Sequence, residues 1–208
     1  MTSDCKRACG HAVVIAFIGI SAWIAFSPQG AAQSSTSPQY DANHQLLVPV
    51  GFEKWIFVGS NLGLAYKPDL PATTKREASR ADKPKFHNVY ISAEAYTQFL
   101  TTKKFPETTM LVMEIFEAAD KEPKDVLASG VFNGQRAGLE VAVKNSHRPD
   151  GSATPWAYYD FTDPADPSKL RASAPAFPDR SCENCHRQHA SMDNVWVQFY
   201  PTLRKAVE

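Results

Sequence analysis

Short runs of alternating apolar and polar residues, typical of half-buried β-strands, recur through the middle of this chain. The clearest run is residues 109–118 (TMLVMEIFEA), in which Leu111, Met113 and Ile115 fall on one face of the strand. Other runs either alternate in the same way or are short, apolar and bounded by turn residues. The predicted strands are residues 55–59, 87–91, 109–118, 139–145 and 156–161.

Residues 131–134 (VFNG) carry an Asn-Gly pair, which predicts a hairpin turn and makes Val131 and Phe132 an extra strand arm. Two glutamates, Glu114 and Glu140, lie within predicted strands. We expect both on the side opposite the apolar residues, in contact with solvent. Facing an internal cavity, they would instead be able to accept protons.

One helix is predicted after the second strand, because Ser92 is a good N-cap and Ala95, Tyr96, Phe99 and Leu100 form an apolar side. Residues 67–85 are polar and contain three prolines, which predicts a long loop. The pattern as a whole therefore favours an antiparallel sheet with few helices.

The N-terminus has the pattern of an export signal. Lys6 and Arg7 precede 15 apolar or small residues, 12–26, and small residues follow where a signal peptidase would cut. We predict a signal peptide over residues 1–32, a flexible Ser- and Pro-rich leader over 33–46 and one domain over 47–208. The periplasm is the expected location. An uncleaved membrane anchor is the alternative, although the apolar run is shorter than the roughly 20 residues of a spanning helix.

The net charge of the chain argues against nucleic acid as a partner. The chain has 22 basic and 22 acidic residues, and without residues 1–32 it has 20 and 21. A domain close to neutrality gives no reason to expect nucleic acid as a partner.

The strongest chemical signal is residues 182–186, which read C-x-x-C-H and match the attachment motif of a c-type haem. The spacing places Cys182 and Cys185 about one helical turn apart, so both thiols can reach the vinyl groups of one porphyrin. His186 follows directly, and its imidazole can bind the iron. We therefore predict one covalent haem c, with His186 as the metal ligand.

Three other interpretations of the motif are weaker. A zinc site would need a second ligand pair, and the only other cysteines, Cys5 and Cys9, lie in the predicted signal peptide. A thioredoxin-like pair would open a helix near the start of its domain. A disulfide between Cys182 and Cys185 would close a short, strained loop.

The predicted fold class is α+β, mainly β: an antiparallel sheet of about five strands, a few helices and a C-terminal helix that attaches the haem. A strand-rich protein with C-x-x-C-H near its C-terminus is unusual among c-type cytochromes.

The chain resembles the cytochrome P-460 family and its relatives, the β-sheet cytochromes c′ (cytochrome c′-β). The stretches that carry the resemblance are residues 86–90 (FHNVY), 104–108 (KFPET), 143–148 (VKNSHR), 156–161 (WAYYDF), 182–186 (CENCH) and 197–201 (VQFYP). The resemblance covers nearly all of the chain from about Leu47. It implies a mostly antiparallel β fold, often dimeric, and chemistry with small nitrogen species.

The two branches of the family differ in what this resemblance implies. Members of the P-460 type oxidise hydroxylamine with a haem crosslinked to a lysine, whereas members of the c′-β type lack the crosslink and bind nitric oxide. Met113 stands where the resemblance places the lysine, and a thioether cannot form an amine crosslink. The stretch around Glu140, by contrast, looks more like the P-460 type.

Met113 admits three roles: an apolar wall residue beside Leu111 and Ile115, a sulfur ligand opposite His186, or an oxidisable sulfur. Leu111 is predicted to contact the cofactor from the same face. Arg148 is expected near the haem propionates or in a surface salt bridge. His87, His147 and His189 are expected to be packing or surface residues, not ligands.

The sequence thus predicts a periplasmic mono-haem c-type cytochrome that binds nitric oxide or a similar small nitrogen species at an open, largely apolar site. The alternatives are a haem enzyme that uses hydroxylamine or peroxide and a plain electron-transfer cytochrome. A cytochrome redox partner and a homodimer are compatible with each of these.

Overall fold

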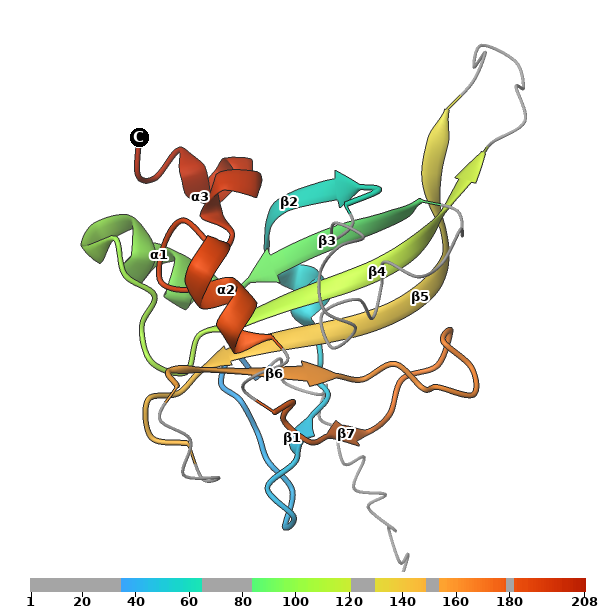
Figure 1. Ribbon diagram of the computed structural model, residues 1–208, viewed down its shortest axis with the longest axis horizontal. Coiled ribbons are helices and arrows are strands. Elements are labelled where there is room, and N and C mark those ends of the chain that lie inside the picture. The colour runs from blue at the N-terminus through green and yellow to red at the C-terminus, as the bar shows by residue number, and fades with distance from the viewer. Residues whose placement is uncertain (1–34, 65–83, 121–129, 149–153, 179–181) are drawn as a thin grey trace, which may run out of the picture. The chain divides into compact units, whose positions relative to one another are not determined.

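The central element of the molecule is a five-stranded antiparallel sheet in which every strand pairs with its neighbour in sequence (Figure 1). The computed structural model describes residues 35–64, 84–120, 130–148, 154–178 and 182–208. The strands are β2 (Ile56–Leu62), β3 (Lys85–Ile91), β4 (Met110–Asp120), β5 (Val131–Lys144) and β6 (Trp156–Asp160). The predicted class, mainly β with an antiparallel sheet, is therefore confirmed, and each of the five predicted strands is present.

The predicted hairpin at Asn133-Gly134 is wrong. β5 runs without interruption from Val131 to Lys144, and its first half pairs with β4 up to Asp120↔Val131. The pairing of β4 with β5 shifts register around Phe116 and Ala118. A Cβ atom at Gly134 would lie 2.9 Å from both the Ala119 Cβ and the Glu117 carbonyl oxygen. The glycine thus permits a close approach of two strands and does not form a turn.

Helix α1 (Ala93–Thr102) begins where the sequence predicts. The Ser92 hydroxyl accepts a hydrogen bond from the Ala95 backbone N–H at 3.2 Å, as an N-cap should. Ala95 and Phe99 are buried, whereas Leu100, which we expected on the apolar side, is 39% exposed. The helix ends at Lys103, whose φ of 57° is left-handed.

Both faces of the sheet are buried, because different segments cover each one. On the first face, Val89, Ile91 and Leu111 pack with α1, the 3-10 turn η2 (Val197–Phe199) and α3 (Pro201–Arg204). On the second face, Val112 and Val141 pack with the N-terminal residues, including Phe52 of the 3-10 turn η1 (Phe52–Lys54). We call these the cavity face and the closed face.

A two-stranded sheet joins the N-terminal segment to the chain after β6. Its strands are β1 (Leu46–Leu47) and β7 (Ser173–Ala174). Leu46, the last residue of the predicted leader, is fully buried and also bridges to Tyr40. Residues 32–208 form one compact unit, while the predicted domain boundaries remain predictions.

Two sequence predictions lie outside the described residues: the signal peptide over 1–32 and most of the loop over 67–85. In the part of the chain that the structure describes, no helix has both the length and the apolar composition to cross a membrane.

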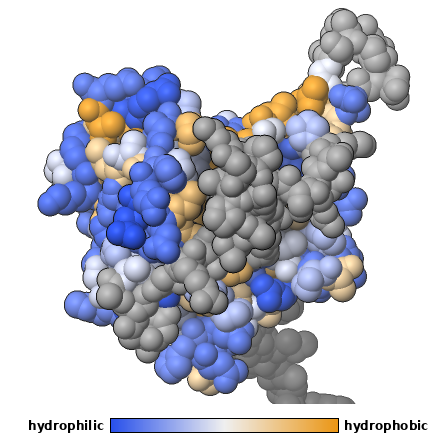
Figure 2. Space-filling view, viewed as in Figure 1, coloured by the Kyte–Doolittle hydropathy of each residue, from blue (hydrophilic) through white to orange (hydrophobic). Residues whose placement is uncertain are grey.

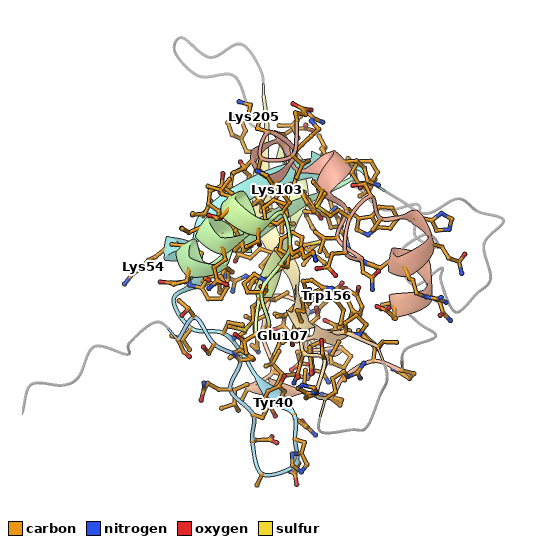
Figure 3. All side chains as sticks on the ribbon, turned by 90° about the vertical axis from the view of Figure 1, so that its left-hand side faces the viewer. Tyr40, Lys54, Lys103, Glu107, Trp156 and Lys205 are labelled. Atoms are coloured by element: carbon orange, nitrogen blue, oxygen red, sulfur yellow. The ribbon has the colours of Figure 1, made fainter. Side chains whose placement is uncertain are left out.

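The surface is mixed in character. In the view of Figure 2, hydrophilic side chains cover most of the region formed by the helices, and hydrophobic ones gather where β4 and β5 project. Val131 and Phe132, in the first half of β5, are 47% and 44% exposed. Lys54 and Lys205 extend outward, whereas Trp156 lies in the interior (Figure 3).

Candidate functional site

A cavity lies between the cavity face of the sheet and the C-terminal segment that carries the C-x-x-C-H motif. Its empty volume is about 530 Å³, part of which is open to solvent. The sheet contributes Val89, Leu111, Met113, Glu140, Ala142 and Tyr158, and the C-terminal segment contributes His186, Asn194, Val195, Trp196 and Tyr200.

The motif residues lie at the start of helix α2 (Glu183–His189). Cys182 is its N-cap, and its carbonyl accepts hydrogen bonds from the backbone N–H groups of Cys185 and His186 at 3.1 and 3.0 Å. The two cysteines are therefore joined by one helical turn, and they form no disulfide with each other. Burial raises the pKa of the Cys185 thiol.

The His186 imidazole is held by a hydrogen bond on each ring nitrogen. Nδ1 lies 2.8 Å from the Asn194 carbonyl oxygen, and because a carbonyl only accepts, Nδ1 carries the proton. Nε2 then presents its lone pair and accepts a hydrogen bond from Trp196 Nε1 at 3.2 Å. Burial lowers the pKa of His186 to about 4, so the neutral imidazole that a metal needs is the form present at pH 7.

Aromatic rings enclose this imidazole. The Tyr158 ring centroid is 4.6 Å from that of His186, and the Trp196 centroid is 5.4 Å away in an edge-on arrangement. Tyr200, which also lines the cavity, is buried, and this burial raises its pKa to about 12. The phenol is therefore neutral at any physiological pH.

The residues present fit a covalently held haem. Two cysteine thiols stand one turn apart, a neutral imidazole with its lone pair on Nε2 lines the cavity, and its Nδ1–H is fixed by a carbonyl, as is usual for metal-binding histidines. Cys182, Cys185 and His186 would hold the group. One change is required, because the single lone pair of Nε2 cannot serve Trp196 and iron together.

Two of the three further residues that the sequence predicted near the cofactor, Leu111, Met113 and Arg148, lie at this site. Leu111 and Met113 line the same cavity as His186, on the sheet side. Arg148 is not among the described residues that line the cavity. It is 8% exposed, and its Nη1 donates to Thr154 Oγ1 and the Trp156 carbonyl, so it holds the start of β6 and is not a surface residue.

The expectation that both strand glutamates contact solvent is wrong. Glu140 is the cross-strand partner of Met113 and lines the cavity. Glu114 is 5% exposed on the closed face, where its carboxylate pairs with Arg136 at 2.8 Å. The sequence argument failed because Leu111 and Met113 face one side of the sheet, whereas Val141 and Val143 face the other.

The cavity is also less apolar than the sequence suggested, since Glu140, Asn194 and, besides His186, five aromatic residues with polar atoms line it: Trp156, Tyr158, Tyr159, Trp196 and Tyr200. The other histidines were not expected to be ligands. Among the described residues, His186 is the only histidine that lines the cavity. His87 is buried on β3, and His147 and His189 are exposed.

Sequence reasoning missed the residues around His186. Trp196 and the carbonyl of Asn194 each bind one of its ring nitrogens, and Glu183, inside the motif, accepts a hydrogen bond from Asn194 Nδ2 at 2.8 Å. A signal for them existed, because Asp193-Asn194 is a favoured turn dipeptide and lies shortly after the motif helix.

Residues 49–197 match the family model of cytochrome P460. No curated protein sequence matches the chain.

Proposed function

The chain belongs to the cytochrome P460 family, whose members hold a haem, and from this premise we propose that it binds nitric oxide or a similar small nitrogen species at one covalent haem c. Cys182 and Cys185 form the two thioethers in this proposal, and His186 is the axial ligand. The observation that carries the proposal is the shared cavity, in which His186 lies on one wall and Leu111 and Met113 on the other.

A haem held by Cys182, Cys185 and His186 would supply an iron that can bind neutral diatomic molecules. Leu111, Val89 and Ala142 would form an apolar part of the wall around that position. Apolar surroundings favour a neutral ligand over an anion, because burying an unpaired charge is costly. The export signal predicted over residues 1–32 supports a periplasmic location.

The residue at position 113 decides between nitric oxide binding and the hydroxylamine oxidation that P-460-type members carry out with a lysine-crosslinked haem. Its side chain lines the cavity at the position where the resemblance places the crosslinking lysine. A thioether has no amine to add to a porphyrin, so the proposal makes Met113 a wall residue. Coordination of its sulfur to the iron, which would suit electron transfer, remains the alternative role.

A second function, oxidation of hydroxylamine, is favoured by one observation. Glu140 lines the cavity directly across from Met113, and a carboxylate in that place can accept the protons that such an oxidation releases. The same carboxylate is also compatible with an enzyme that uses peroxide as its substrate. Both enzyme functions require turnover, whereas ligand binding does not.

Optical spectra of the exported protein test the proposal. We expect a haem c spectrum, five-coordinate iron in the ferrous state, rapid uptake of nitric oxide and no turnover of hydroxylamine. A Met-ligated, six-coordinate ferrous spectrum, or turnover of hydroxylamine that Glu140→Gln abolishes, would contradict it.

Two matched methionine variants locate the ligand site. Met113→Leu is expected to change the rate of nitric oxide binding. Met110→Leu changes a methionine three residues earlier on the closed face, which is 2% exposed, and is expected to leave the rate unchanged. Equal effects of the two variants would remove Met113 from the distal wall.

A further inference from the structure

A tight turn after helix α2 presents the carbonyl that holds His186. The backbone N–H of Val195 donates to the Met192 carbonyl at 2.8 Å, which closes a four-residue turn. Its two central residues, Asp193 and Asn194, have φ values of 46° and 59°. Positive φ at both positions is the conformation of a type I′ turn, and Asp and Asn are among the few residues that adopt it readily.

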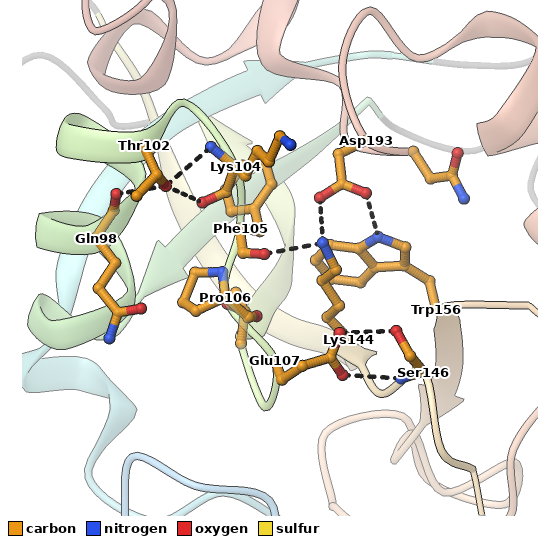
Figure 4. Close-up of polar contacts among 12 residues, drawn as sticks. Gln98, Thr102, Lys104, Phe105, Pro106, Glu107, Lys144, Ser146, Trp156 and Asp193 are labelled. Carbon is orange, nitrogen blue, oxygen red and sulfur yellow. Dashed lines mark hydrogen bonds and ion pairs between the residues drawn. The ribbon is translucent and has the colours of Figure 1, made fainter.

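Side chains from two other elements clamp this turn. Lys144 Nζ, from β5, pairs with Asp193 Oδ2 at 2.6 Å, and Trp156 Nε1, from β6, donates to Asp193 Oδ1 at 3.4 Å (Figure 4). From the side of α2, Glu183 Oε1 accepts from Asn194 Nδ2 at 2.8 Å. The turn is therefore tied both to the sheet and to the helix that carries the C-x-x-C-H motif.

The Lys144–Asp193 pair is built into the fold. The side chains of Lys144 and Asp193 are 14% and 24% exposed, and Lys144 Nζ also donates to the Phe105 carbonyl at 2.8 Å. An exposed pair such as Lys169–Asp166, with values of 72% and 39%, is screened by water and holds little in place. The first pair can fix the position of a backbone turn, and the second cannot.

The turn positions the hydrogen-bond partner of one site atom, His186 Nδ1. The Asn194 carbonyl oxygen lies 2.8 Å from His186 Nδ1, on the residue next to Asp193. A carbonyl in this position fixes the tautomer and ring orientation of a metal-binding histidine and raises the basicity of its other nitrogen. We propose that Lys144 and Asp193 are positioning residues that set the electron donation of His186 to the haem iron, and thereby the reduction potential.

This inference rests on the proposed role of His186 as axial ligand. Loss of the clamp would let the Asn194 carbonyl drift from Nδ1, and a weaker hydrogen bond makes the imidazole a poorer donor. A poorer donor stabilises ferric iron less, so the reduction potential would rise.

The test compares Asp193→Asn and Lys144→Met with the wild-type holoprotein. We expect the ratio of ferrous to ferric protein, at one fixed solution potential, to rise about three- to tenfold in each variant. Partners that touch a metal ligand directly typically change metal affinity or activity 10- to 100-fold when mutated, and we expect a smaller effect on the ferrous-to-ferric ratio because Asp193 acts through its neighbour. The iron–histidine stretching band in resonance Raman spectra should move to lower frequency, and Lys144→Arg should restore both values toward wild type.

Two further variants separate positioning from stability. Asp193→Gly keeps a residue that accepts positive φ but removes the carboxylate, so it should behave like Asp193→Asn. Lys169→Met removes the exposed ion pair and should change neither readout. Asp193→Asn is decisive because its side chain is nearly isosteric with the carboxylate. If this variant folds, binds haem and keeps the wild-type reduction potential and Raman band, the inference is overturned, even if Lys144→Met fails to fold.

Failure of the underlying proposal would look different. A wild-type protein with no covalent haem, or with a five-coordinate ferrous haem that shows no iron–histidine band, would remove His186 as ligand before any variant is made. A normal wild-type band that none of the variants moves would refute the positioning role alone.

Discussion

The two faces of the central sheet are both buried, yet one is filled and the other encloses the candidate site. On the closed face, Met110 and Val112 of β4 pack directly against the N-terminal segment and are 2% and 0% exposed. On the cavity face, Met113 of the same strand is only partly buried and lines the same cavity as His186. The covering segments make the difference, because the two faces have similar apolar residues.

A matched pair of leucine truncations should separate the two faces most strongly. Leu139 is fully buried on the closed face, and Leu139→Ala should lower the free energy of unfolding by about 2–5 kcal/mol without changing the haem spectrum. Leu111 borders an existing cavity, so Leu111→Ala should lower the free energy of unfolding by an amount near the lower end of that range. It should, however, alter ligand-binding rates. Denaturant unfolding and flash photolysis measure the two effects, and reversed effects would contradict the assignment of the faces.

Acid should weaken the cavity side of the haem-free protein through His186. Its folded pKa of about 4 lies below the unfolded value of 6.5, so the unfolded chain binds more protons between these values. Stability is then complete above about pH 6.5 and falls as the pH drops toward 4, by up to about 3 kcal/mol. Unfolding free energies measured across this range for the wild type and His186→Gln give the contribution as a difference. Parallel pH profiles would show that His186 is not buried as a neutral group.

The smallest expected effect concerns Trp196. In the haem-free protein, Trp196→Phe removes the hydrogen bond to His186 Nε2 and should cost about 1 kcal/mol of unfolding free energy. In the holoprotein Nε2 would bind iron, so the same variant should lose no hydrogen bond at this atom. Thermal unfolding of both forms checks this, and an equal loss in both would mean that Trp196 stabilises the protein by packing alone.

The sequence predicted the strands, helix α1 and the helix at the C-x-x-C-H motif, because alternation, a serine N-cap and the spacing of the motif are local signals. It could not assign faces to neighbouring strands, since register decides that Met113 lies across from Glu140 while Val141 points away. It also misread Gly134, whose role depends on the approach of β4. The contacts of His186 with Asn194 and Trp196 depend on a turn that brings later residues back to the helix, and residue spacing does not reveal such a return.

Chemical analysis of the pigment in the correctly exported protein tests the central claim most directly. The account predicts one haem per chain that resists extraction by acidified acetone, gives the pyridine haemochrome spectrum of two thioether bonds, and is lost when Cys182 and Cys185 are both replaced by alanine. A colourless protein, or a haem that acidified acetone removes from the wild type, would contradict it.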